Sequence, residues 1–138
     1  MATTPTYPAA SGPVLISKAL VNADSTNIVD IYDNSAGSSA IRVEALNICS
    51  DDTSTVNLSF YRYSGSTSYL MGTVRAVTLS GTDGATARVN ALAVIGVIAP
   101  DGIPVLEIPA GSKLQVKSLV AVTAAKTVTI TGWARSIA

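Results

Sequence analysis

The sequence contains no histidine, a single cysteine and few charged residues. Charged side chains make up 13% of its 138 residues, whereas 48% of the residues are apolar. Catalytic sites are built mainly from acids, bases, thiols and metal ligands, and this sequence has few of them. Because histidine is absent, a Ser-His-Asp triad is excluded. We therefore predict that the protein is not an enzyme and that it has no catalytic residues, no metal and no cofactor. Its function is expected to lie in its surfaces.

Cysteine pairs and long apolar runs are also missing. The lone Cys49 cannot form an internal disulfide, so we interpret it as a small apolar residue. The N-terminus lacks the basic and apolar regions of a secretory signal, and no uncharged apolar stretch reaches the roughly 18 residues of a membrane span. We expect a protein that is made in a cytoplasm and has no membrane partner.

Neither sign of charge is in excess. Nine basic residues balance nine acidic residues, which gives a formal net charge of zero. Because no basic run is present that would neutralise a row of phosphates, we expect no direct contact with nucleic acid. A chain with so little net charge repels its own copies weakly, and this favours association.

Proline is concentrated at the start of the chain, where it disfavours both helices and central strands. We predict an extended N-terminal arm over residues 1–13 and a single β-sandwich domain over residues 14–138. Such an arm could lie along a neighbouring subunit, and a terminus without contacts is the alternative. The candidate interface residues of the arm are Pro5, Tyr7, Pro8 and Pro13.

The remainder of the chain is typical of an all-β protein. Runs rich in Val, Ile and Thr alternate with clusters of Gly, Ser, Asp and Asn, which predicts about seven or eight antiparallel strands in a sandwich or jelly roll. Apolar and polar residues alternate clearly over 55–61, 113–120 and 127–131. The last two runs are predicted to form a hairpin through 121–126. The side chains predicted to face the core are Val56, Leu58, Phe60, Leu114, Val116, Val120, Val128 and Ile130.

Two segments depart from regular strands. Within 41–49 the apolar residues change phase, which predicts either a bulge near Ala45 or burial on both faces. Residues 90–96 are predicted to form a short helix, because Asn90 is a favourable N-cap and Gly96 a favourable stop. We expect this helix to plug an open end of the sandwich.

Few residues could carry chemistry. Two aspartate pairs could be calcium ligands, although aspartate is common in turns for backbone reasons and we favour that interpretation. These pairs are Asp51 with Asp52 and Asp30 with Asp33. The only glutamates, Glu44 and Glu107, leave open the carboxylate pair of a glycosidase.

Tyrosines gather around one predicted loop. Tyr61, Tyr63 and Tyr69 flank the segment 63–68, and aromatic residues of this kind are frequent in contact surfaces. We treat these three as candidate interface residues. The alternative is that they cover the rim of the core at the ends of strands.

Several segments in the second part of the chain carry a resemblance to a known family. They are IRVEALNICS at 41–50, TVNLSFY at 55–61, LMGTV at 70–74, GTDGA at 81–85, NALAVIG at 90–96, LEIPAGSKL at 106–114 and KTVTIT at 126–131. In pattern and order, these segments resemble small virion structural proteins of tailed bacteriophages and prophages. The resemblance covers about two thirds of the chain.

The resemblance implies a β-sandwich accessory protein of the virion, and capsid decoration or cement proteins fit best. Such proteins bind the outer surface of an icosahedral shell, often as trimers, and stabilise it. The implied partners are the major capsid protein and sister copies, and the implied location is the capsid surface. The family supplies no catalytic residues. Alternatives are a receptor- or carbohydrate-binding knob of a head or tail fibre, and another head–tail accessory protein.

Overall fold

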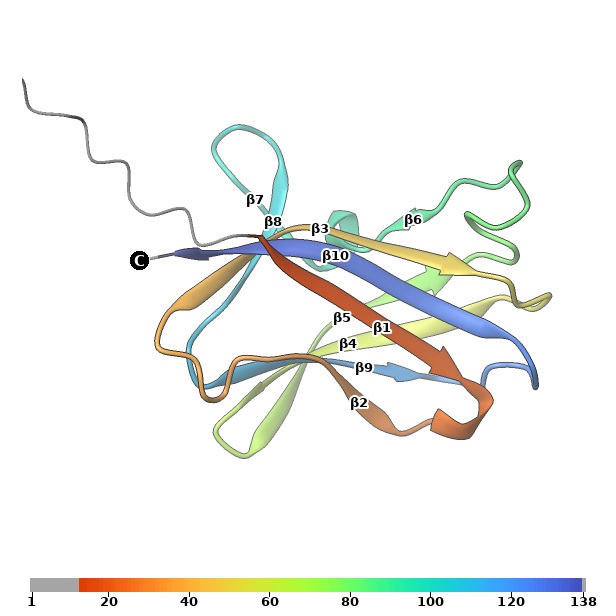
Figure 1. Ribbon diagram of the computed structural model, residues 1–138, viewed down its shortest axis with the longest axis horizontal. Helices are drawn as coiled ribbons and strands as arrows, with labels where there is room; N and C mark the ends of the chain where they lie inside the picture. The colour runs from red at the N-terminus through yellow and green to blue at the C-terminus, as the bar shows by residue number, and fades with distance from the viewer. Residues whose placement is uncertain (1–12, 138) are drawn as a thin grey trace, which may run out of the picture.

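The computed structural model describes residues 13–137, which form two antiparallel β-sheets that face each other across a hydrophobic core (Figure 1). The prediction of an all-β sandwich with one short α-helix is confirmed. Of the predicted arm only Pro13 falls within the described residues, and it is exposed. Pro5, Tyr7 and Pro8 lie outside them.

The larger sheet has the strand order β1-β10-β3-β8-β7, and β6 pairs with β3 beside this path. Its strands are β1 (Val14–Val21), β3 (Ala40–Ser50), β6 (Val89–Asn90), β7 (Val97–Ile98), β8 (Pro104–Ile108) and β10 (Thr127–Ile137). The β1 and β7 strands form its two edges. The C-terminal strand β10 lies inside the sheet, between β1 and β3.

The smaller sheet has the order β2-β9-β4-β5. Its strands are β2 (Ile28–Asp33), β4 (Val56–Ser64), β5 (Thr67–Ala76) and β9 (Ser112–Ser118), and a 3-10 turn, η1 (Asn22–Asp24), leads from β1 into β2. Two of the ten described strands, β6 and β7, have only two residues each. The other eight agree with the predicted number.

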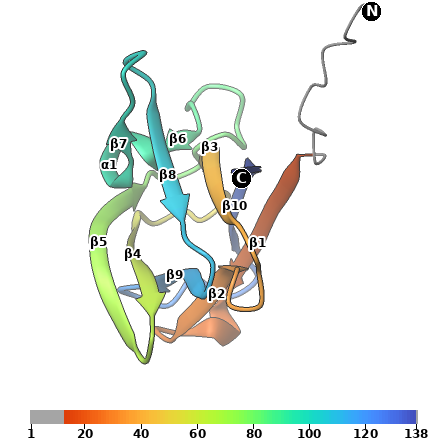
Figure 2. The same ribbon diagram turned by 90° about the vertical axis from the view of Figure 1, so that its left-hand side faces the viewer.

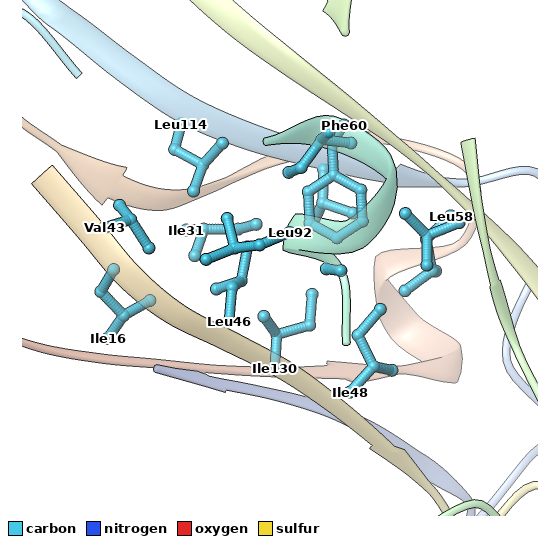
Figure 3. Packing of buried hydrophobic residues seen from close by; sticks show 14 of the residues in the cluster. Ile16, Ile31, Val43, Leu46, Ile48, Leu58, Phe60, Leu92, Leu114 and Ile130 are labelled. Atoms are coloured by element: carbon cyan, nitrogen blue, oxygen red, sulfur yellow. The ribbon is translucent and has the colours of Figure 1, made fainter. Parts of the chain in front are cut away.

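The inward assignments are confirmed with one exception. Seven of the eight side chains predicted to face the core are at most 3% exposed. They pack with residues from both sheets, and Figure 3 shows Phe60 of the smaller sheet, Leu46 of the larger sheet and Leu92 from the helix in this cluster. The exception is Val120, which is 67% exposed.

The hairpin predicted between 113–120 and 127–131 is wrong. The first run forms β9 of the smaller sheet and the second forms β10 of the larger sheet, so the connecting segment crosses from one sheet to the other. The β9 strand ends at Ser118, whose hydroxyl donates a hydrogen bond to the carbonyl of Val120. Beyond this turn Val122, and not Val120, reaches the core.

The predicted bulge in β3 is confirmed. Ala45 pairs with Trp133 and Val43 with Ala134, which leaves Glu44 as the extra residue. Beside the bulge, a Cβ atom on Gly132 would lie 2.0 Å from the carbonyl oxygen of Ala45. Glycine is therefore required at this position, because any side chain would clash with backbone.

The predicted helix is confirmed as α1 (Leu92–Ile95). The Asn90 side-chain oxygen accepts a hydrogen bond from the backbone N–H of Leu92 at 3.1 Å, and the N–H of Gly96 donates to the carbonyl of Leu92 at 2.9 Å. The helix packs against β5 of one sheet and against β3 and β8 of the other. It therefore closes the side of the sandwich between β5 and β8 (Figure 2).

Candidate interaction surfaces

The three candidate tyrosines lie on two faces of the smaller sheet. Phe60 of β4 points into the core, so alternation directs Tyr61 and Tyr63 outward. Arg62 is two residues from Phe60 along β4 and therefore points to the same, inner face of the sheet. Tyr69 of β5 pairs with Arg62, so its side chain also lies on the inner face, at the end of the strand past the core. Tyr61 and Tyr63 thus belong to one surface, whereas Tyr69 is 53% exposed on another.

A hydrogen-bond network fixes the surface around Tyr61 and Tyr63. The side-chain amide of Gln115 donates to Asp30 at 2.9 Å and accepts from the Ser68 hydroxyl at 2.8 Å. These contacts link β2, β9 and β5 across the intervening strand β4. Gln115 is only 8% exposed although it faces outward, because its neighbours on the adjoining strands cover it.

Lys113 joins this network to the second tyrosine. Its ammonium lies 3.3 Å from a carboxylate oxygen of Asp30, 3.8 Å from one of Asp33 and 5.3 Å from the ring centroid of Tyr63. The hydrogen bond to Asp30, together with the charges of both aspartates, raises the pKa of Lys113. The surface is therefore a fixed, polar and aromatic face suited to contact. The charged side chains of this surface, Lys113, Asp30 and Asp33, form ion pairs with one another.

The two glutamates are each held by an arginine. Glu44 lies 3.0 Å from Arg135 and Glu107 lies 2.9 Å from Arg42, and neither glutamate is buried. These pairs lie across β3, β10 and β8, on the outer side of the larger sheet. The arrangement connects neighbouring strands through their side chains.

Asp51 and Asp52 bind backbone and hydroxyl groups, as the turn interpretation predicted. That interpretation is wrong for Asp30, which lies within β2 and binds the side chains of Lys113 and Gln115. The carboxylate of Asp52 accepts hydrogen bonds from the N–H of Ser54 and from both the N–H and the hydroxyl of Thr123, at 2.8–2.9 Å. Asp51 likewise accepts from the N–H of Thr127 at 2.7 Å. Within residues 13–137, no group of three or more His, Cys, Asp or Glu side chains is arranged to hold a metal ion.

An uncharged face covers part of the larger sheet, and the sequence interpretation did not identify it. Its rows of paired residues run across β1, β10 and β3. They are Leu15, Trp133 and Ala45; Ser17, Thr131 and Asn47; and Ala19, Thr129 and Cys49. We call these nine residues the neutral face. Leu15 is 76% exposed and Trp133 is 46% exposed, although both are large and apolar.

A shallow hollow of about 570 Å³ lies beside Cys49 under the loop that contains Gly81 and Arg88. Its loop resembles a phosphate cradle only superficially. The carboxylate of Asp83 already accepts hydrogen bonds from the N–H groups of Ala85 and Thr86, at 2.9 and 2.7 Å. The backbone N–H groups of Ala85 and Thr86 in this turn are thus already hydrogen-bonded to the carboxylate of Asp83.

Comparisons with known proteins do not assign the chain to a family. Neither a protein-family model nor a curated protein matches the sequence. In the described part of the chain, no helix has the length and apolar character needed to cross a membrane.

Proposed function

We propose that the protein is a capsid decoration or cement protein of a tailed bacteriophage, which binds the outer surface of the assembled shell and stabilises it. The family resemblance of residues 41–131 motivates this function. The observation that best supports it is the neutral face, since it offers a broad sheet surface with exposed apolar anchors and no charge to desolvate. The partner would be the major capsid protein.

The position of the neutral face relative to the predicted arm adds to this argument. The arm leads directly into β1, and Leu15 is the second residue of that strand. An extended, proline-containing segment could add main-chain hydrogen bonds along a capsid subunit while Leu15 and Trp133 pack against it. Many symmetric copies of a modest contact would give cumulative strength without a single strong site.

The experiment is binding of the purified protein to empty, expanded shells of the phage. The proposal predicts co-sedimentation with the shells, a higher shell disruption temperature, and a change in the emission of Trp133, the only tryptophan. Leu15→Ser should weaken binding at least about tenfold. Val120→Ser is the matched control, because Val120 is 67% exposed but lies outside the neutral face. Failure to bind any virion-derived particle would refute the proposal.

A receptor- or carbohydrate-binding knob is the second candidate. It is favoured by the surface around Tyr63, where Lys113 and the Asp30–Gln115 network hold polar groups beside an aromatic ring. Binding to a glycan array or to host cells that is lost in Tyr63→Ala would support this function. Tyr69→Ala is the control, since Tyr69 lies on the opposite face of the sheet.

A further inference from the structure

Within residues 13–137, the edge strands of the larger sheet are β1 and β7, and those of the smaller sheet are β2 and β5. The β7 strand has only two residues. The β2 strand carries a bulge at Ile31, and the β5 strand carries one at Met71. Short strands and bulges keep an edge from pairing with another chain. The β1 strand has neither feature, since all eight of its residues pair with β10 in unbroken register.

The free edge of β1 has backbone groups that point away from the sheet. The N–H of Val21 donates to the Asp24 carboxylate at 2.9 Å, so it points away from β10. Because the direction of these groups alternates along a strand, the N–H and C=O groups of Leu15, Ser17 and Ala19 also point to the free edge. Within residues 13–137, no strand pairs with this edge, which lies on the side of the molecule opposite α1 (Figure 2).

A lysine points inward in the middle of this edge strand. Lys18 pairs with the fully buried Ile130, so its side chain starts on the core face of the sheet. Its neighbours on that face, Ile16 and Leu20, are each 1% exposed. Lys18 itself is partly exposed, and the four ion pairs within residues 13–137 do not include it. With apolar side chains on three sides, its ammonium reaches water past the free edge of β1.

We propose that Lys18 prevents the β1 edge from pairing with β1 of a second copy. An added strand would occupy the space through which the ammonium reaches water, and it would bury an unpaired charge. Lys18 also lies near the middle of the strand. An antiparallel pair of β1 strands that uses most of its length therefore places the two lysines opposite or diagonal to each other, where like charges repel.

This protection of the edge is local. The formal net charge of zero gives little long-range repulsion between copies, so a charge at the edge itself has to oppose the pairing. The role is also separate from attachment to a shell, because the neutral face uses the outer side of β1 and Lys18 extends from the inner side. The tests below contain no shell, so their failure would leave the decoration function open.

The first experiment is sedimentation velocity of the full chain over a range of concentrations. Lys18→Ile should lower the concentration at which the protein self-associates at least about tenfold, because it replaces the charge with an apolar side chain. Lys117→Ile is the matched control. Lys117 is also partly exposed and outside the four ion pairs, but its strand β9 has a partner on both edges. Self-association of Lys18→Ile no stronger than that of wild type, or an equal gain in Lys117→Ile, would overturn the proposal.

Thermal melting checks that both variants fold. If Lys18→Ile does not fold, Lys18→Gln replaces it, since glutamine removes the charge and stays polar. We expect a smaller gain in self-association from this variant. The proposal is then overturned if Lys18→Gln associates no more strongly than wild type.

The second experiment locates the contact by hydrogen exchange of backbone N–H groups. In Lys18→Ile, exchange at Leu15, Ser17 and Ala19 should slow at least about tenfold when the protein associates, because these groups then bond to the added strand. The same groups in Lys117→Ile serve as the reference and should not change with concentration. Association of Lys18→Ile without slower exchange at these residues would show that the contact lies elsewhere and would contradict the proposal.

Discussion

At the residue scale, Ala125 adopts a backbone conformation that usually favours glycine. Its φ is 63°, and it occupies the third position of a turn closed by the hydrogen bond from Lys126 N–H to Thr123 carbonyl, at 3.0 Å. A positive φ at this position is typical of a type II turn with glycine. The alanine therefore carries local strain in the loop that crosses between the sheets.

Replacing Ala125 by glycine is expected to stabilise the protein by about 0.5–1 kcal/mol, because the relieved strain exceeds the entropy that glycine adds to the unfolded chain. Urea denaturation measures the change. Ala124→Gly is the matched control, since Ala124 is exposed in the same turn but has no positive φ. It should destabilise, and a gain in both variants would contradict the strain argument.

Asp52 is the buried acid on which this loop depends. Burial opposes its ionisation, but hydrogen bonds from Thr123 and Ser54 outweigh that effect and hold the pKa of Asp52 below its ordinary value. A lowered pKa in the folded state stabilises the fold at pH values above the ordinary aspartate pKa of about 4. This contribution is lost as the pH falls below that value.

We therefore expect the free energy of unfolding to decrease in acid. Asp52→Asn should lower the free energy of unfolding at pH 7 by about 1–3 kcal/mol, and it should also make that free energy less dependent on acid pH. Asp24→Asn is the control, because Asp24 accepts a single hydrogen bond, from Val21 N–H, that an asparagine oxygen can also accept. Denaturation curves at several pH values measure both effects. An unchanged acid dependence in Asp52→Asn would show that other groups cause it.

Sequence patterns identified the direction of most side chains but not their solvent exposure. The alternation over 113–120 predicts that Gln115 faces outward, and it does, yet its contacts with Asp30 and Ser68 depend on strand neighbours that only the sheet order reveals. Trp133 was predictable, because continuing the alternation of 127–131 by two residues directs it outward. The separate faces of Tyr63 and Tyr69 follow from hairpin register, which spacing along the chain does not specify.

At the scale of elements, the bulge of β3 and the glycine of β10 form one unit. The extra residue Glu44 brings the Ala45 carbonyl against Gly132. The bulge was predictable from the phase change of apolar residues. The need for glycine on the partner strand was not, since it arises from pairing between strands that are distant in sequence.

Gly132→Ala is expected to destabilise the protein by about 1–3 kcal/mol, because the added methyl group meets backbone. Gly72→Ala is the matched control in β5, where the nearest atoms are side-chain carbons at 3.4–3.5 Å. Its effect should be smaller than that of Gly132→Ala. Thermal unfolding compares the two, and a harmless Gly132→Ala would mean that the bulge relaxes without cost.

The wrong hairpin shows a general limit of local patterns. Alternation over 113–120 and 127–131 correctly indicates two half-buried strands, but a short connection between antiparallel strands fits both a hairpin and a crossing between facing sheets. The exposed Val120 and the buried Val122 distinguish the two arrangements. Their difference depends on where β9 ends, and periodicity does not determine that point.

At the scale of the whole molecule, the predicted arm and the sandwich are expected to act separately. Among residues 13–137, the buried hydrophobic residues of the core all lie between Ile16 and Ala134. Deleting residues 1–13 should therefore change the melting temperature little and weaken binding to shells. Calorimetry and shell co-sedimentation measure the two effects, with full-length protein as the reference. Unchanged shell binding would exclude a role for the arm in attachment.

The position of β10 sets the order in which the molecule can be completed during its synthesis. Among the strands within residues 13–137, β1 is synthesised before all the others and pairs with β10, which is synthesised after all the others. Until residues 127–137 emerge, Ile16 and Leu20 lack the sheet that buries them. Such non-local pairing slows folding. In the nascent chain, Ile16 and Leu20 are thus shielded from aggregation only after the eleven-residue strand β10 has been made.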